Sequence, residues 1–460
     1  MLKRLRNVLI FVLILAGGFA PVVVSGYTEI EKASRASSHL EAAEHYEAAA
    51  RRLPWRKDLY ELAGHYFYHA RAYARASEAY QRAFERDSLS PEGWMAWGDV
   101  LYLDGNPQRA VEIWTQALDQ PNHSEKLYSR LAEIYQQRGE YHQAALFLQR
   151  YVEKFPQDAA ARYRLGLLLT LTDPPRAASE LIHASQLDPQ FASAAQTLRT
   201  AVNLSALSGS AAEAKVIIGR GLGLVEEWTL AREVFDEAVQ FDEKNAEAWA
   251  WLGEAEQHTA GNEALSFLDR ALALDSSNPV VHGLRGLYFQ RIGNHRQALS
   301  EFQAAAKLEP QNPAWYASIG EEFANLGDLI TALEAYQYAT TVAPQDAHYW
   351  RTLAEFCARN GAYVRDVGIP AARKALELKP KDPLTLDTLG WLMILDNRYY
   401  EAKWYLFQAV EADPQLASAH FHLALLYLQT GDSQSMYEHL TRARDLGSAE
   451  AQALLAQYFP

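Results

Sequence analysis

The chain has 460 residues, of which 49% are hydrophobic and 22% are charged, and its formal net charge is -14. This composition is typical of a folded protein with a large core and excludes a disordered chain. The excess of acidic residues disfavours nucleic-acid binding, because neutralising phosphates requires a concentrated basic surface. Cys357 is the only cysteine, which excludes an intramolecular disulfide and a zinc site built from several cysteines.

Residues 1–26 differ from the rest of the chain. Basic residues near the start precede an apolar run from Val8 to Val24, which is the order found in export signals and signal anchors. The run lies at the lower limit of the ~20 residues that span a bilayer, and Pro21 interrupts its distal part. A retained signal-anchor transmembrane helix and a cleaved signal peptide therefore both stay open.

The charge of this segment predicts the topology, because a basic flank stays on the cytoplasmic side of a membrane. With a retained anchor, the chain would be a single-pass membrane protein with a cytoplasmic N-terminus and extracytoplasmic repeats. With a cleaved signal, it would be secreted or periplasmic.

A small residue recurs at steps of about 34 residues downstream of residue 26. Two parallel series of alanines accompany it, and large side chains follow at fixed offsets. Antiparallel helices approach closely only where side chains are small, and larger residues fill the remaining space. The pattern therefore predicts stacked helical hairpins. The first series consists of Gly64, Gly98, Ala132, Gly166, Gly219, Gly253, Gly286, Gly320, Ala354, Gly390 and Ala424.

Several of these units resemble the tetratricopeptide repeat family. Trp94 and Gly98, followed by Ala110, Trp114 and Ala117, form one good copy of the family pattern. The resemblance implies an all-α fold, namely an α-solenoid in which the hairpins stack into a right-handed superhelix, preceded by the one hydrophobic segment at the N-terminus.

The step from Gly166 to Gly219 is longer than the others, and the added residues predict an unpaired helix followed by a linker. We therefore expect a junction between two repeat arrays. The end of the chain resembles the related Sel1-type repeats and predicts a capping helix. The expected parts are 1–26 as signal peptide or anchor, 27–191 as N-terminal array, 192–210 as irregular helix and linker, 211–448 as C-terminal array and 449–460 as cap.

Residues suited to catalysis or metal binding are scarce. His65 and His69 lie four residues apart, and Asp99 occupies the place of His65 in the next repeat. We interpret the two histidines as surface residues because no fourth ligand is evident. Cys357 falls at a large interhelical position, which indicates a buried structural thiol. The sequence thus predicts no enzyme activity, no catalytic residue, no cofactor and no metal site.

The family resemblance implies that the first helix of each hairpin lines a groove, which could take an extended peptide or a partner helix. The alternative that these side chains are merely solvated charges stays open. The groove candidates are Glu254, Gln257, His258, Glu321, Asn325, Arg351, Glu355 and Arg359.

One subclass of the family grips a terminal carboxylate, and Lys126 and Arg130 match the last pair of its binding residues. Glu61, His65 and Ala96 stand where its other basic and amide residues should be. We therefore do not expect binding of a chaperone tail. The many tyrosines and tryptophans are largely explained by repeat packing.

The repeats and the N-terminal segment together predict a non-enzymatic scaffold, membrane-associated or exported, that mediates protein–protein interaction and complex assembly in the cell envelope. Its expected partners are proteins or peptides, with membrane contact through the N-terminal segment and no nucleic acid. The alternative function is an accessory subunit that binds a ligand such as a glycan and regulates a membrane enzyme. A stably co-purifying protein favours the scaffold, and ligand-induced thermal stabilisation without a partner favours the alternative.

Overall fold

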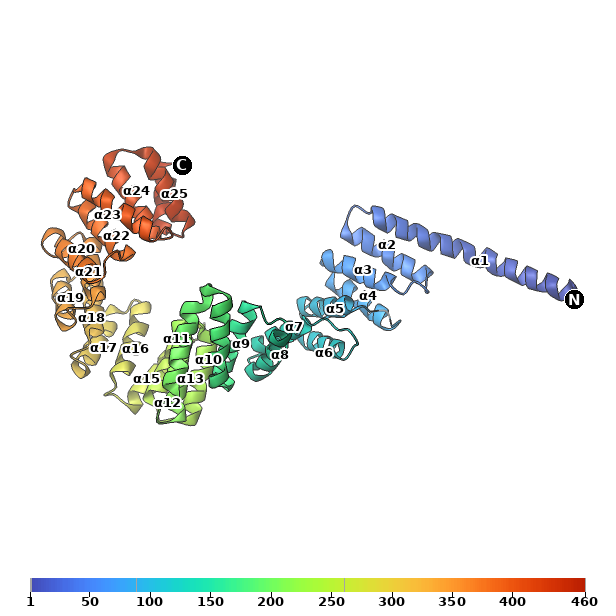
Figure 1. Ribbon diagram of the computed structural model, residues 1–460, viewed down its shortest axis with the longest axis horizontal. Helices are drawn as coiled ribbons and strands as arrows, with labels where there is room; N and C mark the ends of the chain where they lie inside the picture. Colours follow the sequence, from blue (N-terminus) through green and yellow to red (C-terminus); the bar gives the residue numbers. More distant parts are fainter. Residues whose placement is uncertain (1, 88, 260, 460) are drawn as a thin grey trace. The chain divides into compact units, whose positions relative to one another are not determined.

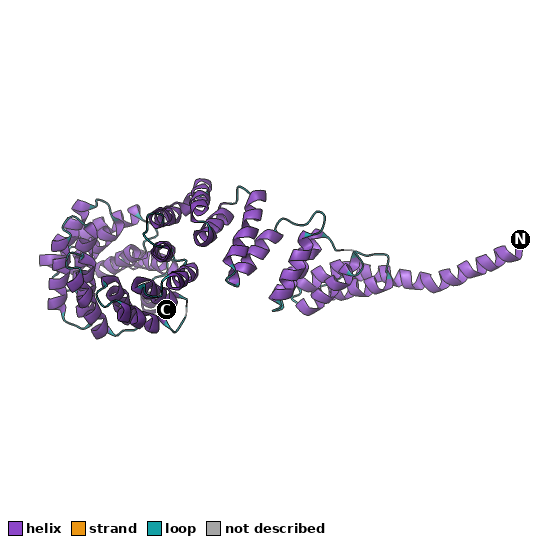
Figure 2. Cartoon of the chain, turned by 90° about the horizontal axis from the view of Figure 1, so that it is seen from below, coloured by secondary structure: helices purple, strands orange, loops and turns teal. Residues whose placement is uncertain are grey.

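The computed structural model describes residues 2–87, 89–259 and 261–459, and side-chain positions from residue 17 onward (Figure 1). Within this part of the chain the regular elements are 26 α-helices, one short 3-10 helix and one π turn, with no strand (Figure 2). The chain divides into two compact units, which we call unit 1 (Met1–Ala206) and unit 2 (Leu207–Pro460). The all-α solenoid of tetratricopeptide-like repeats is confirmed.

Unit 1 contains the first eleven α-helices. They are α1 (Leu2–Arg35), α2 (His39–Arg52), α3 (Leu59–His69), α4 (Tyr73–Phe84), α5 (Pro91–Leu103), α6 (Pro107–Leu118), α7 (Leu127–Gln137), α8 (Tyr141–Lys154), α9 (Ala159–Thr172), α10 (Pro174–Leu187) and α11 (Ala192–Ser205), with the 3-10 helix η1 (Pro189–Phe191) before α11.

Unit 2 contains the remaining helices. They are α12 (Ala211–Leu224), α13 (Trp228–Phe241), α14 (Ala246–His258), α15 (Ala264–Leu274), α16 (Pro279–Arg291), α17 (His295–Leu308), α18 (Pro313–Asn325), α19 (Leu329–Val342), α20 (Ala347–Asn360), α21 (Ile369–Leu378), α22 (Pro383–Leu395), α23 (Tyr399–Ala412), α24 (Ala417–Thr430), α25 (Ser433–Asp445) and α26 (Ala449–Tyr458), with the π turn η2 (Val364–Gly368) before α21.

Each hairpin closes through a short turn whose chemistry is visible in the α5–α6 pair. Gly105 follows α5 with φ of +79°, a left-handed conformation that glycine adopts without a steric penalty. The Asn106 N–H then donates to the Leu101 carbonyl over 2.9 Å, which satisfies a carbonyl at the helix end. Pro107 opens α6, where its missing N–H costs nothing. The chain therefore reverses direction within a few residues.

The two helices of a hairpin meet where a small residue faces a large ring. A Cβ atom at Gly98 would lie 2.0 Å from the indole nitrogen of Trp114, and one at Gly219 would lie 2.5 Å from the Phe235 ring. Both rings are buried. The recurrent small residue of the sequence thus marks the closest approach of the two helices, as its spacing predicts.

Helix α1 runs without a break through residue 26, where we expected a boundary between the hydrophobic segment and the repeats. A Cβ atom at Gly26 would lie 2.5 Å from Leu53, so packing against the repeats already includes this residue. The apolar run from Val8 lies mostly outside the residues whose side chains are described. Among the described residues, no helix combines the length and the apolar character needed to cross a membrane.

Helix α11 lies in the segment 192–210, where the sequence predicts an unpaired helix and a linker. It packs against α10 and buries Ala195, Leu198 and Val202, which share one helical face. The Phe191 ring also stacks on Tyr163, with 4.7 Å between the ring centroids. Helix α11 therefore extends the core of unit 1. At the other end of the chain, α26 packs on α25 through Ala451 and Leu455.

We expect Gly98→Ala to destabilise the protein although alanine is the better helix former. The added methyl group would meet the buried Trp114 ring at 2.0 Å, and such overpacking costs about 1–3 kcal/mol. Thermal unfolding followed by circular dichroism should show a midpoint lowered by about 2–4 °C per kcal/mol.

The control is Gly209→Ala, because a Cβ atom there would make only an ordinary contact of 3.6 Å with Glu213. This variant should unfold at the wild-type temperature. Equal midpoints for the two variants would contradict the role assigned to the close approach at Gly98.

Candidate functional site

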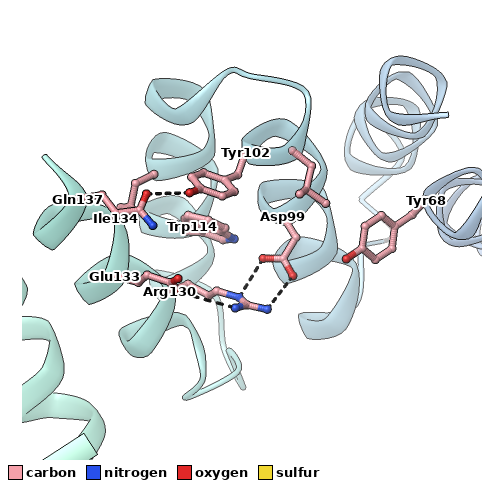
Figure 3. Close-up of a pocket in the computed structure, with 9 residues that line it drawn as sticks. Tyr68, Asp99, Tyr102, Trp114, Arg130, Glu133, Ile134 and Gln137 are labelled. Atoms are coloured by element: carbon pink, nitrogen blue, oxygen red, sulfur yellow. Dashed lines mark hydrogen bonds and ion pairs between the residues drawn. The ribbon is translucent and has the colours of Figure 1, made fainter. Parts of the chain in front are cut away.

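A hollow of about 190 Å³ opens on the face of three successive first helices in unit 1 (Figure 3). Helix α3 supplies one lining residue, α5 and α7 supply most of the others, and α6 supplies the floor. Together the lining residues are Tyr68, Asp99, Tyr102, Leu103, Trp114, Arg130, Glu133, Ile134 and Gln137.

The repeat register explains why these side chains meet. Tyr68 and Tyr102 are 34 residues apart, as are Asp99 and Glu133, so each pair occupies equivalent positions of neighbouring repeats. On α5, Asp99, Tyr102 and Leu103 follow the spacing of three and four residues that places side chains on one helical face. The same face of α7 carries Arg130 and Glu133. The hollow is thus a product of the stacked repeats.

An ion pair crosses the hollow between α5 and α7 (Figure 3). Nε of Arg130 lies 3.1 Å from Oδ1 of Asp99, and Nη2 donates to Oδ2 over 3.3 Å. Glu133 lies farther from the guanidinium, with 3.9 Å between Nη1 and Oε2. Arg130 is therefore bidentate on Asp99 and only loosely associated with Glu133.

Burial raises the pKa of two side chains that line the hollow. It raises the pKa of Asp99, and the Arg130 guanidinium opposes the rise only in part. Burial also raises the pKa of Tyr68, and the negative charge of Asp99 adds to the rise. Water thus solvates the Asp99 carboxylate poorly. The neighbouring Tyr102 hydroxyl donates to Oε1 of Gln137 over 2.7 Å.

The groove candidates of unit 2 form two groups. In the first, the Glu254 carboxylate is buried and accepts hydrogen bonds from Arg291, with Nη1–Oε2 and Nη2–Oε1 distances of 2.8 and 2.5 Å. Gln257 and His258 also contact this carboxylate, at 3.2 and 3.3 Å. Three predicted residues therefore meet in a network that joins α14 to α16.

In the second group, Glu321, Glu355 and Arg359 act electrostatically on the buried Tyr336. Burial is the main cause that raises the pKa of Tyr336, the charges of Glu321 and Glu355 add to the rise, and Arg359 opposes it. Arg351 donates to Glu355. Asn325 and Arg359 are exposed. These residues are accessible to a partner to different degrees, and their binding role stays a prediction.

Several residues of these sites were missed from the sequence. Arg291 lies 33 residues after His258, the same step as from Gly253 to Gly286, so the repeat register could have found it. The same register relates Asp99 to Glu133, and Tyr102 lies on the same helical face. Glu322 of α18 was also missed. It is fully buried and contacts His295 Nδ1 at 2.8 Å.

The other candidate chemical groups are engaged within the fold. His65 has both ring nitrogens near partners, Nδ1 at 2.9 Å from the Tyr80 hydroxyl and Nε2 at 3.4 Å from Glu61. Among the described residues, no cluster of three or more His, Cys, Asp or Glu side chains could hold a metal ion. Cys357 is buried, and its burial raises the pKa of the thiol to about 12.

In unit 2, the pKa values of His282 and His439 are shifted in opposite directions. Nδ1 of His282 lies 2.6 Å from Glu301, and this hydrogen bond raises the pKa of His282, although burial and Arg285 oppose it. Nδ1 of His439 lies 3.1 Å from Nδ1 of His420. Burial and His420 lower the pKa of His439, against a smaller opposing effect of Glu438.

Comparisons with known proteins agree with the helical-repeat fold. Family models described as tetratricopeptide repeat match residues 60–124, 101–168 and 284–339. A model described as the middle TPR-like domain of cilia and flagella-associated protein 70 matches residues 316–446. The chain therefore belongs to the tetratricopeptide repeat family, whose scaffolds are suited to protein–protein interaction and are generally non-catalytic. No curated protein matches the chain.

Solved structures with the same kind of fold share little sequence with the chain. Yeast Tom70 is 18% identical over 88% of this chain and 95% of its own, with a TM-score of 0.43. The APC/C hetero-tetramer Cut9–Hcn1 is 16% identical over 95% of each chain, with a TM-score of 0.46. A tetratricopeptide repeat protein from Parabacteroides merdae is 14% identical over 54% of this chain and 98% of its own, with a TM-score of 0.44. At these values the likeness carries no functional argument.

The substitutions His282→Gln and His439→Gln should change the pH dependence of the free energy of unfolding in opposite directions. His282 has a raised folded pKa, so its contribution is complete below the unfolded value of about 6.5 and is lost as pH rises through the folded pKa. His439 has a lowered folded pKa, so its contribution is complete above about 6.5 and is lost as pH falls through the folded pKa.

The measurement is urea unfolding of wild type, His282→Gln and His439→Gln between about pH 5 and pH 8.5. The stability lost in His282→Gln should be larger at the acidic end, and the stability lost in His439→Gln larger at the alkaline end. Parallel curves for the two variants would show that neither histidine is held in the protonation state inferred from its contacts.

Proposed function

We propose that the protein is a non-catalytic scaffold that holds an extended segment of a partner protein along the first helices α3, α5 and α7. The observation that carries this proposal is the hollow of about 190 Å³ in Figure 3, whose lining includes residues at equivalent positions of successive repeats. An extended peptide presents side chains at regular intervals, and pockets of this kind give such complexes their specificity.

The composition of the hollow supports a protein ligand. Leu103, Ile134 and Trp114 provide apolar contact, and Asp99 and Arg130 provide fixed polar groups. Apolar walls with a few placed polar groups are the usual features of a binding site.

We further propose that the scaffold acts at a membrane of the cell envelope, with its N-terminus cytoplasmic and its repeats extracytoplasmic, or that it is exported. Support comes from the basic residues followed by the apolar run Val8 to Val24. A scaffold placed there would assemble or position other envelope proteins. The groove candidates of unit 2 would form a second contact surface, through the exposed Asn325 and Arg359.

A photo-reactive residue at position 137 should form an adduct with the partner in membranes of the native host. Gln137 lines the hollow and is exposed, and Gln143 on α8 is exposed outside it. The same photo-reactive residue at position 143 is therefore the control and should give no such adduct. Mass spectrometry of the adduct would identify the partner peptide.

The substitution Leu103→Glu tests whether the hollow itself is needed. It should reduce the adduct at position 137 by about tenfold, because a charge would enter the apolar wall that the partner contacts. Leu103 and Leu146 are 48% and 47% exposed, so Leu146→Glu makes the same change outside the hollow and should leave the adduct intact. Equal adducts from both variants, or none in wild type, would argue against the proposed scaffold site and favour a glycan or other ligand.

The membrane proposal is tested by alkaline carbonate extraction of host membranes. The full chain should stay in the membrane pellet, and a variant lacking residues 2–20 should be released, because the apolar run would be gone. This deletion keeps Val23 and Ile30, which pack against the core of α2 and α3. Sequencing the N-terminus of the mature protein would separate a retained anchor from a cleaved signal, and retention of the deletion variant in the pellet would show that the apolar run does not anchor the protein.

A further inference from the structure

The hollow between α5 and α7 has walls that differ in chemistry. Leu103, Ile134 and the buried Trp114 form its apolar part. Tyr68 and Tyr102, at equivalent positions of neighbouring repeats, also line the hollow, and in Figure 3 they lie on opposite sides of Asp99. A long side chain with an aliphatic stem could bury that stem here and leave its end near the tyrosine rings.

The charges around the hollow are not balanced. Its lining contains two carboxylates, Asp99 and Glu133, and one guanidinium, Arg130. Arg130 is bidentate on Asp99, and the Glu133 side chain is 56% exposed, 3.9 Å from the same guanidinium. An incoming cation would find Glu133 accessible and Asp99 poorly hydrated. An incoming carboxylate would first have to displace Asp99 from Arg130.

The aromatic rings favour the same sign of charge. Cations are attracted to the faces of aromatic rings, and tyrosine is among the better acceptors. Unit 1 already uses this contact internally. The Arg75 guanidinium lies 4.2 Å from the centroid of the Phe67 ring, and that of Arg86 lies 4.5 Å from the Tyr60 ring.

We infer that the hollow receives a lysine or arginine side chain from the extended partner segment. The aliphatic stem packs against Leu103 and Ile134, and the charged end lies near Glu133 and the rings of Tyr68 and Tyr102. This inference rests on the proposed function, because it names the chemistry of the segment that the scaffold holds. It also explains why Arg130, which matches a carboxylate-gripping residue in one subclass of the family, has a different role here.

The test is a selection of peptides by the purified full chain. The probe is a library of 12-residue peptides with random flanks and lysine, arginine, leucine, glutamine or glutamate at a fixed central position. Wild type should enrich lysine and arginine at that position, and affinities measured by fluorescence anisotropy should fall as salt rises.

Two variants separate the charge from the rings. Glu133→Gln should weaken the lysine and arginine peptides by about three- to tenfold and leave the leucine peptides unchanged. Tyr102→Leu should also reduce the preference for the cation while it keeps an apolar wall. Glu112 is exposed on α6 outside the hollow, so Glu112→Gln is the matched control and should bind as wild type does.

The outcomes distinguish this inference from the proposal on which it rests. Enrichment of leucine or another apolar residue, with no effect of Glu133→Gln, would overturn the cation site and leave the scaffold proposal standing. Enrichment of glutamate would assign the site to Arg130 and also overturn the inference. If no peptide is enriched and no adduct forms at position 137, both proposals fail.

Discussion

The close approach of two helices at a small residue is the constraint on which the rest of the structure depends. At Gly98 no Cβ atom fits beside Trp114, and the same holds for Gly286 beside Phe302. Because the buried ring fills the space that the glycine leaves, each hairpin has a fixed spacing and rotation. Repetition of this contact gives the first helices a common face, so residues 34 positions apart become neighbours. The hollow of unit 1 and the charge networks of unit 2 are both consequences of this register.

The register also decides which charges meet. Arg291 is the equivalent of His258 one repeat later, and its side chain reaches back to cover Glu254. Arg130 makes the same kind of contact with Asp99 of the preceding repeat. Such pairs connect adjacent hairpins, and breaking a buried pair is costly because it leaves an uncompensated charge. A groove residue that joins two repeats in this way contributes to the stability of the solenoid and is less accessible to a partner.

Much of the fold could be predicted because its signals are local. The small and large positions of each hairpin recur within one repeat, and the structure agrees with them. The candidate site was harder to predict, because it depends on contacts between long side chains of neighbouring repeats. Glu254 was expected to face a partner, but it is buried beneath Arg291. The exposed aromatic residues of α23 show the same limit. Tyr400 is 90% exposed and Trp404 58% exposed, and repeat packing does not account for either.

The division between paired and accessible charges has a consequence for specificity. Asp99 and Glu133 are equivalent residues of neighbouring repeats, yet only Asp99 is held by a bidentate guanidinium. Asp99 therefore helps to hold neighbouring repeats together, whereas the Glu133 side chain is more than half exposed. Changing Glu133 can alter the charge that the groove presents without disturbing the pair that joins α5 to α7. A substitution at one repeat can thus change the charge of the surface while the hairpin packing beneath it stays the same.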